Sequence, residues 1–236
     1  MNLPVAILAG GLATRLGDIA RQVPKALVDV AGTPFAERQI ELLARHGVRR
    51  IVFLVGHLGE RIESTIGDGR RWNVEIQYAY DGPALLGTGG ALRAALDRLG
   101  TRFLVLNGDT YLECDYEAIE SAFVAARTEG LMTISREPRP GRANVRYENG
   151  RVVAYDKGTA DPRMQHADNG LNGFTSEAFR ACPDGAFDLG VVQRALIARQ
   201  QLLAIEIPQS YFDMGSPEGL AALAAHLSST VARSRT

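Results

Sequence analysis

Short apolar runs alternate with amphipathic segments through the first half of the chain. The apolar runs are bounded by turn residues and predict buried β-strands over residues 4–9, 49–56, 74–80 and 102–109. The segments between them repeat their apolar positions at helical spacing. Strands that alternate with helices in this way predict β-α-β units, and therefore a mostly parallel sheet with helices on both faces. Ligands of such sheets bind at the carboxyl ends of the strands.

Three helices are expected between these strands. The clearest begins with Thr33 as its N-cap and Pro34 as its first helical residue, and it ends at Gly47. Shorter helices are predicted over residues 58–67 and 89–100.

The pattern changes from about Leu131, where strand signals follow one another without helices of comparable strength. Asn149 and Gly150 form a dipeptide that is typical of a tight hairpin turn. We therefore expect an antiparallel or mixed extension of the same sheet, built from residues 131–138, 144–158 and 202–215.

The remaining segments predict a loop and a closing helix. Residues 159–170 are polar and lack periodicity, which indicates a loop that is able to cover a ligand. Ser216 and Pro217 begin the last helix, and residues 229–236 are predicted to form a flexible tail. Because no repeat or linker divides the chain, we expect one domain over residues 1–228.

Composition and charge narrow the class of partner. The chain has 236 residues, is 46% hydrophobic and carries a formal net charge of -1, so it resembles an ordinary globular domain without the basic excess of a nucleic-acid-binding protein. Cys114 and Cys182 lie far apart and outside any metal-ligand spacing, which predicts a reducing, cytoplasmic location. No signal peptide or membrane span is predicted, so small molecules are the expected partners.

The first strand runs directly into a glycine pair that is suited to an anion. Gly10 and Gly11 can turn backbone N–H groups toward a phosphate, and the Arg15 guanidinium can hold two phosphate oxygens. The segment "AGGLATRL" completes neither the P-loop nor the dinucleotide fingerprint. Lys25 by itself is more readily explained as a solvated turn residue, but beside the glycines it becomes a candidate phosphate ligand.

Two aspartates and a second glycine cluster add to this picture. Asp109 and Asp213 each follow a predicted strand next to a glycine, where one or two carboxylates suit Mg²⁺, although Asp109 is equally suited to starting a turn. The cluster "LLGTGGAL" surrounds Thr88 at a helix start and can leave room for a flat base.

The segments "LAGGLATRL", "PKAL", "LGTGGAL", "LNGDTYL" and "YFDMGSPEG", in this order, resemble the sugar-1-phosphate nucleotidyltransferases, also called nucleotide-sugar pyrophosphorylases. The resemblance covers nearly the whole chain. It implies a Rossmann-like three-layer α/β sandwich with a mostly parallel mixed central sheet. No hexapeptide repeat follows residue 220, so the β-helix extension of longer members is not expected. The chain is most similar to short bacterial enzymes that join GTP to manno-heptose or mannose 1-phosphate for cell-surface polysaccharides such as lipopolysaccharide or capsule.

The resemblance implies a reaction in which the sugar 1-phosphate attacks the α-phosphorus of a nucleoside triphosphate and pyrophosphate leaves. Catalytic roles fall to Arg15 and Lys25, and Mg²⁺ would be held by Asp109 and Asp213. The half of the chain up to about residue 130 would bind the nucleotide through Leu8, Ala9, Gly10, Gly11, Gly87, Thr88, Gly89, Asn107 and Gly108. The half over residues 131–228 would bind the sugar through Asn144, Asp156, Lys157, Asp168 and Asn169, together with Asp109.

Two departures from the family pattern fall on the sugar side. The usual Glu-Lys-Pro appears as "YDKGT", with Asp156 in place of the glutamate, and the usual Asn-x-Gly motif appears as "DNGLN", with Asp168 in the asparagine position. Alternatives are UTP with N-acetylmuramate 1-phosphate, UTP or dTTP with glucose 1-phosphate, and an inert module that binds a nucleotide sugar. A nucleotide-dependent glycosyltransferase is disfavoured because the strand end carries no Asp-x-Asp pair. The sequence makes no prediction of oligomeric state.

Overall fold

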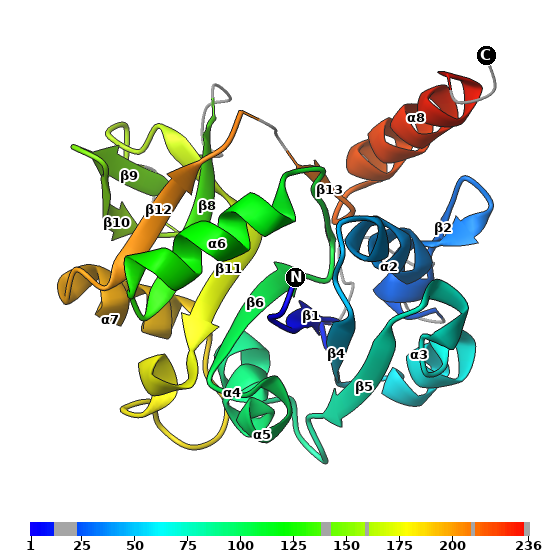
Figure 1. Cartoon of the computed structure of the whole chain (residues 1–236), viewed down its shortest axis with the longest axis horizontal. Helices are drawn as coiled ribbons and strands as arrows, with labels where there is room; N and C mark the ends of the chain where they lie inside the picture. The colour runs from blue at the N-terminus through cyan, green and yellow to red at the C-terminus, as the bar shows by residue number, and fades with distance from the viewer. Residues whose placement is uncertain (12–22, 138–142, 159–160, 209–210, 234–236) are drawn as a thin grey trace.

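Four parallel strands form one side of a nine-stranded sheet (Figure 1). The computed structural model describes residues 1–11, 23–137, 143–158, 161–208 and 211–233, and for 230–233 the backbone alone. The parallel strands lie in the order β6, β1, β4 and β5, with β5 at the edge of the sheet, and their bounds are Arg102–Asn107, Val5–Leu8, Arg50–Val55 and Glu75–Tyr80. Each of the four lies within one of the apolar runs from which a strand was predicted.

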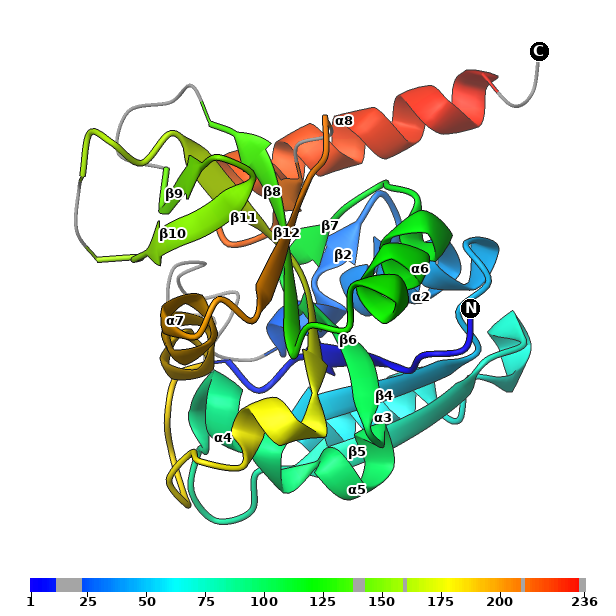
Figure 2. The same cartoon turned by 60° about the vertical axis from the view of Figure 1, so that its left-hand side comes forward.

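A second group of strands extends the sheet beyond β6. Strand β11 (His166–Thr175) runs antiparallel to β6 and also pairs with β8 (Gly130–Arg136), while β12 (Leu202–Glu206) lies parallel to β8. The hairpin of β9 (Val145–Glu148) and β10 (Arg151–Tyr155) completes this side (Figure 2). Its turn residues Asn149 and Gly150 have φ angles of 50° and 78°. The predicted hairpin turn and mixed extension are therefore confirmed.

Helices cover both faces of the sheet, because alternate residues of each central strand point to opposite sides. Val5 and Ile7 enter a core with helices α2, α3 and α6, whereas Ala6 enters a core with α4, α5 and α7. The helices have the bounds Phe35–Arg45, Gly59–Ile66 and Tyr116–Ala126 on the first face, and Gly87–Ala94, Leu96–Leu99 and Gly190–Ala198 on the second. The fold is thus the expected three-layer α/β sandwich. In the described part of the chain, no helix has the length and apolar character needed to span a membrane.

Helix α8 (Pro217–Arg233) packs on α2 through a third, smaller core that contains Phe35, Tyr111, Met214 and Leu223. Ser216 accepts a hydrogen bond from the Gly219 N–H at 3.1 Å, as expected of a cap. The short elements are β2 (Asp29–Val30), β3 (Thr33–Pro34), β7 (Thr110–Tyr111), β13 (Phe212–Asp213), η2 (Lys25–Leu27), η3 (Arg70–Trp72) and η4 (Ser176–Phe179).

Several boundaries differ from those expected. Thr33 does not cap α2, because it pairs with Val30 in the β2–β3 hairpin and the helix begins at Phe35. The helix predicted over 89–100 is divided into α4 and α5. Helix α8 continues to Arg233, beyond its expected end near residue 228.

The largest correction concerns residues 159–170, which were predicted to be a loop. Strand β11 begins at His166, and its polar residues are buried rather than exposed. Asp168 and Asn172 can be buried there because they bond to each other and to neighbouring elements, and Asn169 bonds to Ser135 of β8, as described below.

Candidate active site

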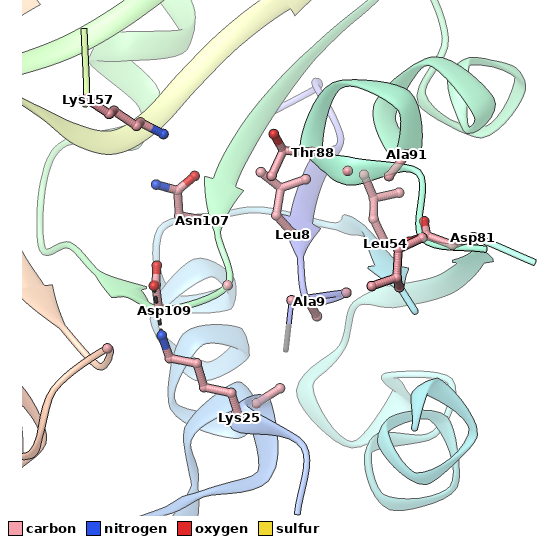
Figure 3. A pocket seen from close by; sticks show the side chains of 17 residues that line it. Leu8, Ala9, Lys25, Leu54, Asp81, Thr88, Ala91, Asn107, Asp109 and Lys157 are labelled. Carbon is pink, nitrogen blue, oxygen red and sulfur yellow. Dashed lines mark hydrogen bonds and ion pairs between the residues drawn. The ribbon is translucent and has the colours of Figure 1, made fainter. Parts of the chain in front are cut away.

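A cavity of about 410 Å³ lies at the carboxyl ends of the parallel strands, the edge at which ligands of such sheets bind. Many of the residues singled out from the sequence meet there, although they come from segments far apart along the chain (Figure 3). The predicted site residues that line the cavity are Leu8, Ala9, Gly10, Gly11, Lys25, Gly87, Thr88, Asn107, Gly108, Asp109 and Lys157. Arg15 lies outside the described residues.

The glycines at this edge differ in how much space surrounds them. A Cβ atom on Gly108 would lie 2.1 Å from the Leu8 carbonyl oxygen, so the close approach of β6 to β1 requires glycine. A Cβ atom on Gly10 would lie 3.2 Å from the Gly56 nitrogen, which is also a tight contact. Around the Cβ position of Gly11, no atom of the other described residues lies within 4 Å, chain neighbours aside. Packing therefore explains Gly108, whereas Gly11 leaves its backbone accessible from the cavity.

Charged groups gather at one end of the cavity. Lys25 Nζ and Asp109 Oδ2 form an ion pair at 2.8 Å, and both side chains are partly buried. Lys157 extends from the loop after β10 toward Asn107, at the end of β6 (Figure 3). This end therefore presents two cations and a carboxylate to a ligand that carries phosphate groups.

A buried glutamine holds the segment that carries Asp109. Gln39 of α2 is fully buried, and its Nε2 donates to the carbonyl oxygens of Asn107 at 3.2 Å and of Thr110 at 2.8 Å. We did not single out Gln39 from the sequence. The available signal was a polar residue on the apolar stripe formed by Phe35, Ile40 and Leu43.

Asp213 reaches the same edge through a short strand pair. Strand β13 pairs with β7, and the Met214 N–H donates to the Asp109 carbonyl at 2.8 Å. Asp109 Oδ2 accepts from Lys25 Nζ, and Asp213 Oδ1 accepts from the Gly215 N–H at 2.7 Å. The other oxygen of each carboxylate forms no hydrogen bond with the described residues. No group of three potential metal ligands occurs in the described residues. Asp109 directly precedes β7, and Asp213 ends its partner strand β13 without lining the cavity. Two carboxylates suit Mg²⁺, which takes its other ligands from phosphates and water, and a shared site of these two residues stays a prediction.

The opposite end of the cavity is apolar except for one carboxylate. Leu54, Leu85 and Ala91 line it, as does Asp81, which follows β5 directly. Asp81 Oδ2 accepts a hydrogen bond from the Leu86 N–H at 3.2 Å. Burial raises the pKa of the Asp81 carboxyl group above its ordinary value, and the Leu86 hydrogen bond opposes this effect. Asp81 was not among the residues predicted from the sequence, although its place at the end of a predicted strand matches that of Asp109.

The glycine cluster at the start of α4 packs against a neighbouring loop. The Gly89 N–H donates to the Phe187 carbonyl at 2.9 Å, and a Cβ atom on Gly89 would lie 2.3 Å from the Phe187 ring. The Thr88 hydroxyl donates to Asp188 at 3.1 Å and accepts from the Leu189 N–H at 2.8 Å. Gly89 therefore contacts this loop, whereas Leu85, Gly87, Thr88 and Ala91 of the predicted cluster line the cavity. Contact between Gly89 and a nucleotide stays a prediction.

Most of the predicted sugar-side residues lie beside the cavity rather than in its wall. Asp168 accepts hydrogen bonds from the Tyr155 hydroxyl at 3.1 Å and from Asn172 Nδ2 at 3.2 Å, and Gln193 of α7 donates to Asn172. Burial, reinforced by the Asp168 charge, raises the pKa of Tyr155. Asp168 is therefore the centre of a buried network between β10, β11 and α7.

The other sugar-side candidates adjoin this network. Asn144 Oδ1 accepts from the Asp168 N–H at 2.9 Å, and the Asn144 carbonyl accepts from the Asp156 N–H at 3.0 Å. Asn169 Oδ1 accepts from the Ser135 hydroxyl at 2.8 Å, whereas its buried Nδ2 has no hydrogen-bond partner in the parts of the chain that the structure describes. Contact between these side chains and a sugar stays a prediction.

Comparison with known proteins agrees with this arrangement. The sequence profile of the family described as "Nucleotidyl transferase" matches residues 5–160, and the chain belongs to this family. The match includes the glycine pair, Lys25, Asp109 and the start of the sugar-side segment.

Three curated relatives have related names. The chain is 29% identical over 205 residues to a UTP--glucose-1-phosphate uridylyltransferase from Synechocystis, covering 78% of this chain and 52% of the relative. It is 37% identical over 113 residues to an N-acetylmuramate alpha-1-phosphate uridylyltransferase from Neisseria meningitidis, covering 48% of this chain and 49% of the relative. It is 32% identical over 114 residues to a D-glycero-alpha-D-manno-heptose 1-phosphate guanylyltransferase from Campylobacter jejuni, covering 48% of this chain and 51% of the relative. The chain thus spans about half the length of these relatives.

Among solved structures, HddC from Yersinia pseudotuberculosis in complex with GMP-PN is similar, with a TM-score of 0.80. The sequences are 24% identical, and the alignment covers 95% of this chain and 99% of HddC. This likeness supports the fold.

Proposed function

We propose that this chain transfers a nucleoside monophosphate from a nucleoside triphosphate to a sugar 1-phosphate and releases pyrophosphate. The observation that carries the proposal is the cavity itself, which joins an apolar end to a charged end containing Lys25 and Asp109. Such a cavity suits a nucleotide whose base lies among apolar side chains while its phosphates lie among charges. Family membership and the names of the relatives support the same reaction class.

The residues act by positioning the substrates and neutralising charge. The backbone at Gly10 and Gly11, together with Arg15, would hold the triphosphate and stabilise the leaving pyrophosphate. Lys25 would neutralise charge near the α-phosphate, and Lys157 would orient the sugar phosphate. That phosphate is already an anionic nucleophile, so the reaction needs no general base and no covalent intermediate.

Asp109 and Asp213 would hold Mg²⁺, which when bound would reduce the repulsion between the phosphate groups. The Lys25–Asp109 ion pair would then loosen, because Lys25 exchanges one anionic partner for another. We place nucleotide binding in residues 1–130 and sugar binding in residues 131–228.

We propose GTP and manno-heptose or mannose 1-phosphate as the substrates. The support is the resemblance of "LGTGGAL" to guanylyltransferases and the relative named as a heptose 1-phosphate guanylyltransferase. The relative named as an N-acetylmuramate uridylyltransferase favours UTP with N-acetylmuramate 1-phosphate, which is the alternative substrate pair. Asp156 and Asp168 would repel the carboxylate of a muramate substrate, which supports the neutral sugar.

An assay for pyrophosphate release tests this proposal. The purified chain is supplied with GTP, UTP, dTTP or ATP and with mannose, manno-heptose, glucose or N-acetylmuramate 1-phosphate. We expect turnover to be highest with GTP and a manno-configured sugar. Turnover at least tenfold higher with UTP and N-acetylmuramate 1-phosphate would overturn the substrate proposal, and no turnover with any pair would overturn the reaction class.

A further inference from the structure

Asp81 places an unused hydrogen-bond acceptor in the apolar end of the cavity. Its N–H donates to the Val55 carbonyl at 3.0 Å, and its Oδ2 accepts from the Leu86 N–H at 3.2 Å. These bonds fix the residue at the end of β5. Within the described chain, Oδ1 receives no hydrogen bond, although the side chain lines the cavity and is half-buried.

Among the described residues, no cation pairs with the Asp81 carboxylate. The cavity wall at this end consists of Leu54, Leu85 and Ala91 with glycine backbone, while Lys25 and Lys157 lie at the other end (Figure 3). Burial raises the pKa of the Asp81 carboxyl group, so the residue carries a desolvation cost that no ion pair within the described chain offsets. A ligand that donates hydrogen bonds to Oδ1 would offset this cost.

We propose that Asp81 determines the base specificity of the enzyme by accepting hydrogen bonds from the N1–H and the exocyclic amino group of guanine. This inference rests on the proposed nucleotidyltransferase function. Guanine is the common base that presents two adjacent donors on its Watson–Crick edge, and a carboxylate is the matching acceptor. Uracil and thymine present one donor between two carbonyl oxygens, which a carboxylate repels. Adenine presents an acceptor at N1.

The location of Asp81 agrees with this role. Phosphates that lie near Lys25 and Asp109 would leave the base among Leu54, Leu85 and Ala91, the part of the wall that Asp81 adjoins. Its carboxylate also lies against the backbone at the start of the glycine pair, because a Cβ atom on Gly10 would be 3.5 Å from Asp81 Oδ2. The same carboxylate therefore meets both the loop 81–86 and the segment after β1.

The variant Asp81→Asn is the sharpest test. Asparagine has the same shape, and its oxygen can keep the Leu86 hydrogen bond while its Nδ2 replaces the free acceptor with a donor. Specificity constants (kcat/KM) are measured with GTP, with ITP, which lacks the exocyclic amino group, and with UTP. We expect wild type to prefer GTP over ITP by about tenfold or more, since hydrogen bonds to a charged acceptor are strong. In Asp81→Asn the ratio of kcat/KM for GTP to that for ITP should fall close to one, and kcat/KM for UTP should rise relative to that for GTP. The control Glu75→Gln, exposed at the other end of β5, should keep the wild-type ratios.

The outcomes separate the two proposals. If wild type releases pyrophosphate but does not distinguish GTP from ITP, the inference is overturned without any variant. Equal losses with all three triphosphates in Asp81→Asn would show that Asp81 only supports the loop 81–86, and would also overturn it. If no substrate pair gives turnover, the proposed reaction fails, and titration of GTP and ITP binding to wild type and Asp81→Asn then decides whether Asp81 recognises guanine.

Discussion

Lys25 and Asp109 show how single side chains define the charged end of the cavity. Their ion pair is partly exposed, so it contributes little to the free energy of folding. The ion pair instead positions the Lys25 ammonium group and the Asp109 carboxylate where we propose that phosphate groups bind. Replacing Asp109 should therefore impair the reaction more than the fold.

The variants Asp109→Asn and Asp213→Asn should each lose at least about a hundredfold in turnover, because each removes one of the two carboxylates that we propose as magnesium ligands without a change in volume. Pyrophosphate release measured over a range of Mg²⁺ concentrations checks this result, and circular dichroism reports on folding. The control Asp97→Asn, on the exposed side of α5, should keep wild-type turnover. Full activity of either site variant at ordinary Mg²⁺ would refute the metal assignment.

Gln39 gives a second prediction for a single residue, one that acts through its neighbours. In Gln39→Met the carbonyl oxygens of Asn107 and Thr110 lose their buried donor, which should cost about 1–3 kcal/mol of stability. Because Asp109 lies between them, the Mg²⁺ concentration for half-maximal turnover should also rise. The matched control is Gln193→Met, since Gln193 is equally buried but bonds to Asn172. If both variants lose stability while their Mg²⁺ dependence stays that of wild type, Gln39 has no positioning role.

At the scale of secondary-structure elements, the ends of β1 and β6 approach each other closely at the site. A Cβ atom on Gly108 would meet the Leu8 carbonyl oxygen at 2.1 Å, so Gly108→Ala must push the two strand ends apart. We expect a loss of about 1–3 kcal/mol in the free energy of unfolding, as in other overpacked positions. Urea denaturation measures it. Gly11→Ala serves as the control for stability, because in the described part of the chain no atom beyond its chain neighbours lies within 4 Å of its Cβ position. A comparable loss there would contradict the packing explanation.

At the scale of the whole molecule, α8 connects the end of the described chain to the site. Leu223 of α8 is fully buried with Phe35 of α2 and with Met214, which directly follows Asp213. Removal of the Leu223 side chain in Leu223→Ala should cost about 2–5 kcal/mol of stability through the lost contacts and the cavity left behind. Denaturant unfolding checks this value, with Glu218→Ala on the exposed first turn of α8 as the control. A loss of less than about 0.5 kcal/mol would show that α8 does not stabilise the domain.

The sequence by itself determined the central sheet, because strands buried on both faces need continuous apolar runs and leave a strong local signal. It likewise determined the Asn149-Gly150 turn, which requires positive φ angles. It also brought Gly10, Lys25 and Asp109 into one hypothesis, since parallel strands place their carboxyl ends at one edge.

Tertiary structure alone decided the features that depend on partners distant in the chain. The polar sequence at the start of β11 predicts a loop, yet Asp168 is buried because Tyr155 and Asn172 satisfy its carboxylate. The contact of Gly89 with the Phe187 ring likewise depends on a residue far along the chain. Gln39 on an apolar stripe and Asp81 at a strand end leave local signals that mark their positions but not their contacts, because the atoms that they meet come within reach only in the folded chain.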